Sequence, residues 1–251
     1  MKASLSPRTL NVAWLALSVV MAASTILHAQ DLVVQKDNQR REGLITGVTD
    51  GKVKIKIGPA ETTIAMAQIA SVTKAAPKAF DDGLAAWQKG DANQALTLLK
   101  PLVDTYGGLP TPWAERSSAL LGDIYLALNQ LPNAEAAFAA FQKAYPEATS
   151  QADIGLARLA VEKKDFATAK AKLEPVVAEA SKVSVAPAGK NAAYGQAYYL
   201  MGVILESEGN YPEALRDYLT AVTLFSEDQA VVAQAQQRAD ILIKEKKVIV
   251  P

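Results

Sequence analysis

LGDIYLALNQLPNAEAAFAAFQKAYP, residues 121–146, contains the clearest structural pattern in the chain. Apolar residues recur three and four positions apart before and after the turn signal at 129–132, so the stretch predicts two amphipathic helices joined by a tight reversal. Gly122 in the first helix and Ala134 in the second are small, which lets the two helices approach closely. Tyr125 and Phe138 are large and fill the remaining space. Residues 121–146 therefore predict one closely packed helix pair.

The same order of residues recurs along the chain. A second clear copy is YYLMGVILESEGNYPEALRDYLTA, residues 198–221, and two weaker copies lie at residues 83–102 and 156–176. All four copies have a small residue at one position of the first helix: Gly83, Gly122, Ala157 and Gly202. These positions are 39, 35 and 45 residues apart, and the excess over a period of about 34 residues indicates insertions.

The pattern resembles the tetratricopeptide repeat, in which a large residue, Leu-Gly, an aromatic, Gly, Ala, an aromatic, Ala and Pro follow one another in fixed order. The resemblance covers residues 78–247. It implies a mainly α-helical protein whose repeat region is an α-solenoid of about four helix pairs. Residues 227–247 are helical and end in polar residues, so they are expected to form a capping helix.

The resemblance also implies a groove on the first helices of the pairs, where proteins of this family bind peptides. The repeat alignment places nine residues there: Phe80, Trp87, Asp123, Leu126, Arg158, Val161, Tyr199, Val203 and Glu206. The apolar members are expected to contact a peptide segment of a partner protein, and the charged members to set its register. The alternative is that the terminal helix or the N-terminal domain covers the groove, which would make these residues intramolecular contacts.

One binding mode of the family can be tested on the sequence. Stacks that clamp a C-terminal carboxylate have Lys, Arg and Asn at equivalent groove positions. Here those positions are Leu84, Asp123, Arg158 and Val203. Because this set is mixed, the carboxylate specificity is not predicted.

Residues 31–74 alternate between apolar and polar with a period of two, which predicts β-strands. In Lys52–Ile57, Val53, Ile55 and Ile57 are expected to face inward and the lysines to face water. Asp50-Gly51 between two apolar runs predicts a hairpin. Five short strands in so few residues favour a small closed or half-closed β-barrel of the SH3-like or Sm-like kind.

The first 29 residues have the layout of a signal peptide. Lys2 and Arg8 precede an uncharged run, Val12–Leu27, and Ala29 follows as a small residue at a cleavage position. The run is shorter than the roughly 20 residues that span a bilayer. Cleavage near Ala29 and a periplasmic or secreted location are therefore expected. The alternative is an uncleaved leader that anchors the protein in the inner membrane.

The composition excludes several functions. Lys plus Arg and Asp plus Glu both number 26, which disfavours nucleic-acid binding because that requires an excess of cations. Cysteine is absent and the single histidine, His28, lies in the leader. The usual zinc ligands and the imidazole of a Ser-His-Asp triad are therefore missing after cleavage.

The sequence thus predicts a non-catalytic scaffold or adaptor without metal or cofactor, exported to the bacterial envelope, whose partner is another protein or a peptide segment. It is similar to envelope proteins that use these repeats to assemble or regulate other machinery. The alternatives are a membrane-anchored structural scaffold and an enzyme based on carboxylates or lysine.

Overall fold

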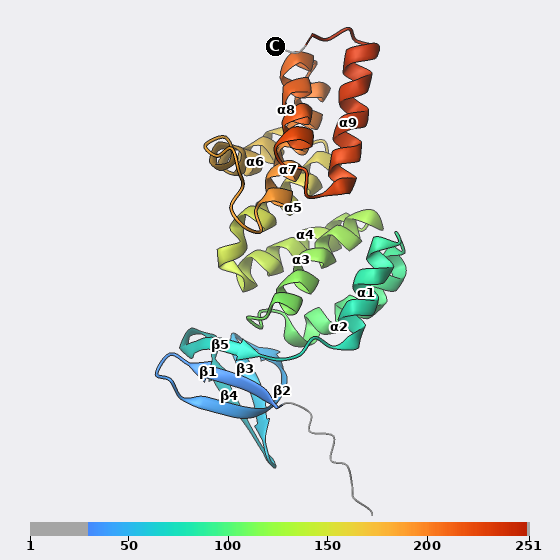
Figure 1. Cartoon of the computed structure of the whole chain (residues 1–251). Helices are drawn as coiled ribbons and strands as arrows, with labels where there is room; N and C mark the ends of the chain where they lie inside the picture. Colours follow the sequence, from blue (N-terminus) through green and yellow to red (C-terminus); the bar gives the residue numbers. More distant parts are fainter. Residues whose placement is uncertain (1–29, 250–251) are drawn as a thin grey trace, which may run out of the picture.

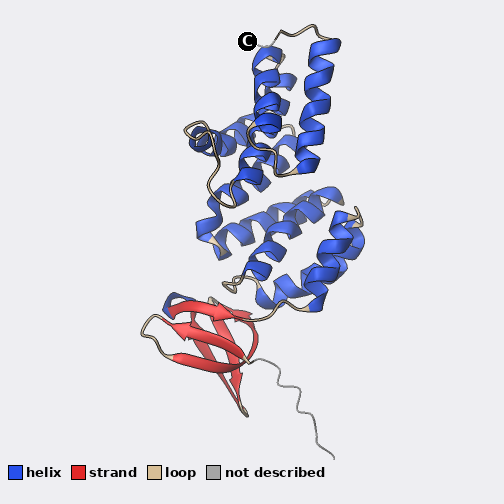
Figure 2. Cartoon of the chain, viewed as in Figure 1, coloured by secondary structure: helices blue, strands red, loops and turns tan. Residues whose placement is uncertain are grey.

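The computed structural model describes residues 30–249, so the expected leader, residues 1–29, lies outside the described residues. A β-sheet forms one end of the molecule and the helices stack away from it (Figures 1 and 2). The strands are β1 (Asp31–Gln35), β2 (Arg40–Thr49), β3 (Lys52–Ile57), β4 (Ala60–Ala65) and β5 (Ile69–Thr73). The helices are α1 (Lys78–Gln88), α2 (Ala92–Tyr106), α3 (Pro112–Ala127), α4 (Leu131–Ala144), α5 (Thr149–Glu162), α6 (Phe166–Ala180), α7 (Asn191–Ser207), α8 (Tyr211–Thr223) and α9 (Gln229–Lys244), with short 3-10 turns η1 (Met66–Gln68) and η2 (Pro146–Ala148).

The helices form four antiparallel pairs, α1–α2, α3–α4, α5–α6 and α7–α8, and α9 packs on the last pair. The predicted α-solenoid with a capping helix is therefore confirmed. The small residues act as expected: a Cβ added at Gly202 of α7 would lie 2.6 Å from the ring of Tyr218 in α8. The reversal between α7 and α8 uses Gly209, whose φ of 81° favours glycine.

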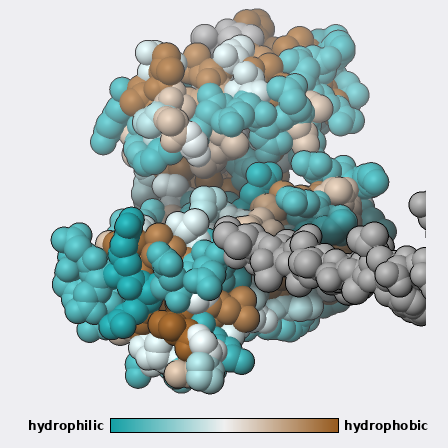
Figure 3. Space-filling model, turned by 60° about the horizontal axis from the view of Figure 1, so that its bottom comes forward, coloured by the Kyte–Doolittle hydropathy of each residue, from teal (hydrophilic) through white to brown (hydrophobic). Residues whose placement is uncertain are grey.

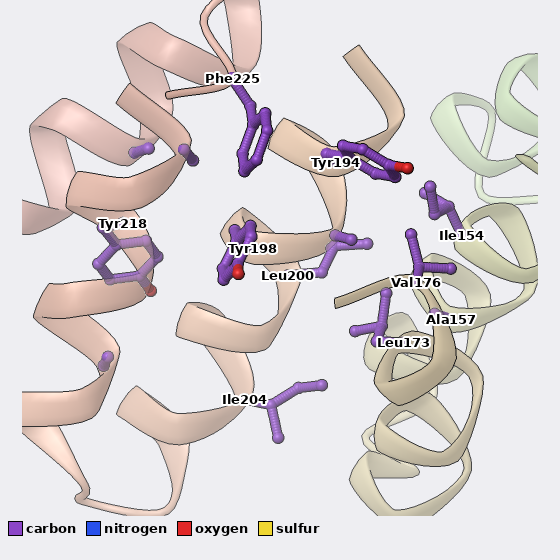
Figure 4. Close-up of a cluster of buried hydrophobic side chains, with 14 of the residues drawn as sticks. Ile154, Ala157, Leu173, Val176, Tyr194, Tyr198, Leu200, Ile204, Tyr218 and Phe225 are labelled. Carbon is purple, nitrogen blue, oxygen red and sulfur yellow. The ribbon is translucent and has the colours of Figure 1, made fainter. Parts of the chain in front are cut away.

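The second half of the stack has a continuous hydrophobic core that joins α5 to α9 (Figure 4). The rings of Tyr198 and Phe225 stack with their centres 5.6 Å apart, and Tyr194 meets Phe225 edge-on at 5.3 Å. Leu173 of α6 and Ile154 of α5 belong to the same buried cluster. The last helix pairs and the capping helix thus share one core.

Asp217 of α8 is the unusual member of this region, because it is a carboxylate that is only 7% exposed. The nearest cation is the exposed Arg216, with 4.0 Å between Arg216 Nε and Asp217 Oδ1, and no hydrogen bond to the carboxylate occurs among residues 30–249. Burial raises the pKa of Asp217 to about 6, and the nearby Glu213 adds to this rise while Arg216 opposes it. Asp217 is therefore a source of instability when it is ionised.

We predict that Asp217→Asn stabilises the protein by about 2 kcal/mol at pH 7.5. The pKa of Asp217 is higher in the folded state than in the unfolded state, so the wild type gains stability as the pH falls from about 6 to 4. Above pH 6 the carboxylate is ionised in both states, and the full cost of burying its charge destabilises the fold. The buried amide keeps part of the desolvation cost, which limits the gain. Urea unfolding at pH 7.5 and pH 4 measures the difference, which should nearly vanish at pH 4. An equal difference at both pH values would contradict the assignment.

The five strands form one antiparallel sheet in the order β4-β3-β2-β1-β5. The five strands are confirmed, but a closed barrel is not formed, because β4 and β5 remain the two edges of the sheet. The SH3-like or Sm-like type stays a prediction. A register shift in β2 between Ile45 and Gly47 bends the sheet. Val33, Ile45 and Ile55 of the sheet lie in one buried cluster with Leu99 and Leu109 of the helical part.

The β3 pattern is confirmed at two of its three apolar positions. Val53 and Ile55 are fully buried, whereas Ile57 at the end of the strand is 37% exposed. Lys52 and Lys56 are exposed, as expected, and Lys54 is half-buried. Hydrophilic residues cover most of the sheet end, with small hydrophobic patches among them (Figure 3).

A buried ion pair joins the start and the end of the sheet, at the point where the sheet meets α2 and α3. Lys74 Nζ lies 2.9 Å from Asp31 Oδ2, and both side chains are only 10% exposed. The backbone N–H of Ile45 donates to the same oxygen at 2.8 Å. From the helical side, Trp113 Nε1 donates to the carbonyl of Lys74 at 3.0 Å, and the ring of Tyr106 lies 5.3 Å from Lys74 Nζ. These contacts fix the sheet against α2 and α3.

Candidate peptide-binding groove

The groove lies along the first helices of the pairs. Residues from α1, α3, α5, α7 and α9 line it, and its volume is about 770 Å³. The first helices are neighbours in the stack, since α1 contacts α3, α3 contacts α5, α5 contacts α7 and α7 contacts α9. Within residues 30–249, no helix has the length and apolarity needed to cross a membrane.

Most of the predicted groove residues do line this groove. The seven that do are Trp87, Asp123, Leu126, Arg158, Val161, Tyr199 and Val203. All seven are partly exposed, which leaves their side chains accessible from the groove. Whether they bind a peptide stays a prediction.

Phe80 does not belong to the groove, and its prediction as a groove residue is wrong. It is 8% exposed and lies in the cluster shared with the sheet, where its ring centre is 6.5 Å from that of Trp113. The reason is that Phe80 lies in the first turn of α1, where its ring packs against Trp113 of α3. Glu206 is also outside the lining, but it contacts Arg238, which is part of the lining.

Four polar side chains bond to one another across successive first helices. Arg158 of α5 donates through Nη1 to Asp123 of α3, and through Nη2 to Oε1 of Gln196 of α7 at 3.0 Å. Gln196 Nε2 in turn donates to Oδ2 of Asp228 at 2.9 Å. Asp228 also caps α9, because its other oxygen accepts the N–H of Ala230 at 3.1 Å. This row ties α3, α5, α7 and α9 together along the groove.

A second polar cluster holds α9 beside α7. Glu206 Oε2 accepts hydrogen bonds from Tyr218 Oη at 2.6 Å and from Arg238 Nη1 at 3.0 Å. Burial, and then the hydrogen bond to Glu206, raise the pKa of Tyr218, so the phenol remains a donor at neutral pH. The ring of Tyr199 lies 6.0 Å from that of Tyr218. Through these contacts α9 forms one side of the groove and does not fill it.

Five further residues line the groove that were not predicted from the sequence: Arg116, Glu162, Gln196, Asp228 and Arg238. Gln196 and Arg116 lie on first helices, one or two turns before the aligned repeat positions. Asp228 and Arg238 belong to α9, which was predicted only as a cap. The Asp228 N-cap before an apolar helix was the signal that could have placed α9 as a further first helix.

Comparison with known protein families matches two segments, residues 80–149 and 154–229, to the tetratricopeptide repeat. The chain belongs to the tetratricopeptide repeat family. The first matched segment covers most of the first two helix pairs of this TPR protein, and the second covers most of the next two. TPR stacks generally bind other proteins or peptides, so the groove is the candidate site. No curated protein matches the sequence.

Proposed function

We propose that this TPR protein is an exported, non-catalytic adaptor of the bacterial envelope that holds a peptide segment of a partner protein in the groove. The observation that supports it best is the chemistry of the groove. Trp87, Leu126 and Val161 leave apolar surface accessible there, while the polar residues of the floor are bonded to one another. An accessible apolar surface beside a satisfied polar row suits the docking of another chain.

We predict that filling the groove abolishes binding without unfolding the protein. Ala127 and Ala230 are exposed and line the groove, so Ala127→Trp with Ala230→Trp adds bulk without removing a core contact. With the chain starting at Gln30 as bait in envelope extract, recovery of a specific partner should fall at least about tenfold. The melting temperature should stay within about 2 °C of the wild type.

The matched control is Ala139→Trp, on an exposed position of α4 outside the groove lining. It should leave partner recovery unchanged. If the groove-filled variant recovers as much partner as the wild type does, the partner binds elsewhere. If the variant is much less stable than the wild type, the two alanines have a structural role.

Export is proposed from the leader layout and is tested separately. The full chain, expressed in a Gram-negative host, should be recovered from the periplasmic fraction with the mass of a chain that starts at Gln30. Recovery of the uncleaved 26.7 kDa chain in the membrane fraction would favour the anchored alternative.

A further inference from the structure

The charged residues of the groove fall into two groups. The first group is paired within the protein: Asp123, Arg158, Asp228 and Arg238. The second group is Arg116 of α3 and Glu162 of α5, which are exposed. In the described part of the chain, neither residue makes an ion pair or a side-chain hydrogen bond. These two charges are therefore available to a ligand, whereas the paired charges could be used only by breaking an internal contact.

The contact between Asp123 and Arg158 fixes how the two helices align along the groove. Arg116 lies seven residues before Asp123, about 10 Å along α3, and Glu162 lies four residues after Arg158, about 6 Å along α5 in the opposite sense. Since α3 and α5 run in the same direction, the two charges lie at opposite rims, about 16 Å apart along the helix axes.

Apolar side chains lie toward both rims, and Leu120, three residues before Asp123, lies toward the Arg116 rim. Leu126 and Val161 each lie three residues after the paired Asp123 and Arg158, and so toward the Glu162 rim. Trp87 near the end of α1 lies on the same side. The groove thus has an acidic rim and a basic rim, with apolar side chains on both sides of a paired polar row.

We infer that the groove receives an amphipathic α-helix whose apolar stripe packs on Leu126 and Val161, with basic side chains toward Glu162 and acidic side chains toward Arg116. An α-helix with side chains is about 10–12 Å wide, so long charged side chains on its flanks reach both rims. An extended strand that packs alternate side chains on the floor points the others away from it, so neither set is directed at the rims. The inference rests on the proposed function and adds the conformation and charge pattern of the partner segment.

The test uses a phage-displayed library of random 16-residue peptides, selected on the chain that starts at Gln30. Enriched peptides should have apolar residues spaced three and four apart, with acidic residues on one flank of that stripe and basic residues on the other. Selection on Arg116→Glu should replace the acidic flank by a basic one, and selection on Glu162→Arg should replace the basic flank by an acidic one. The control bait Lys182→Glu, exposed and outside the groove, should enrich the wild-type pattern.

One enriched peptide is then measured by fluorescence anisotropy. Arg116→Glu should weaken the binding of this peptide about fivefold. A second peptide, with basic residues in place of those on the acidic flank, should bind Arg116→Glu as tightly as the first peptide binds the wild type. Peptides that bind the groove with alternating apolar residues, or without charge bias, would overturn the inference and leave the proposed function standing. The variant Ala127→Trp with Ala230→Trp should fail to bind the enriched peptides. If it binds all of them, or if no peptide is enriched, both the inference and the proposed groove are overturned.

Discussion

Lys74→Ala is expected to lower the free energy of unfolding by about 3–5 kcal/mol. The substitution leaves the carboxylate of Asp31 buried with the N–H of Ile45 as a donor and without a cation. It also removes the ammonium group beside the ring of Tyr106. A protein of this size should then melt roughly 10 °C lower. Thermal and urea unfolding of the chain that starts at Gln30 measure both quantities.

Two controls separate this effect from the loss of an ordinary lysine. Lys78→Ala breaks the ion pair with Asp82, whose side chains are 84% and 46% exposed, and should cost less than about 0.5 kcal/mol. Asp31→Asn combined with Lys74→Met removes both charges and should be less destabilising than Lys74→Ala alone. If Lys74→Ala behaves like Lys78→Ala, the buried pair between the start and the end of the sheet does not contribute to stability.

The repeat region was predictable because the residues that pack its helices recur at regular intervals in the sequence. A small residue on the first helix and a large residue on the second recur together, so Gly122 with Phe138 and Gly202 with Tyr218 define the register of each pair. Once the register is known, the 3.6-residue period assigns the remaining positions to the core or to the groove. For this reason seven of the nine predicted residues line the groove.

The errors occur where a contact does not repeat. Phe80 has the same place in its repeat as Tyr199, but its ring meets that of Trp113, and this contact has no equivalent in the other pairs. Gln196 could not be aligned because the insertion at 181–189 obscures the register before α7. Whether the sheet closes was also beyond the sequence, since alternation identifies the buried face of a strand and not the partner of its edge.

Gly122→Leu is expected to destabilise the repeat stack by about 3 kcal/mol, at the upper end of the usual cost of overpacking. A Cβ at Gly122 would overlap the ring of Phe138, and a Cβ at Gly155 of the next pair would overlap the same ring. The ring is therefore held between α3 and α5 and cannot move away from a larger side chain. Leucine also has a higher helix propensity than glycine by about 0.8 kcal/mol, which offsets part of the cost. Ala139→Leu, at an exposed position of α4, should leave stability nearly unchanged.

The clash itself can be isolated by removing the ring. Phe138→Ala alone should cost about 3–5 kcal/mol, because it leaves a cavity between the two glycine-bearing helices. In the Gly122→Leu background the same truncation should cost at least about 2 kcal/mol less, since the leucine occupies space that the ring had filled. Urea unfolding of the wild type, both single variants and the double variant gives this coupling energy. Additive effects would mean that Gly122 and Phe138 do not share the space between the helices, and the repeat register would then be wrong.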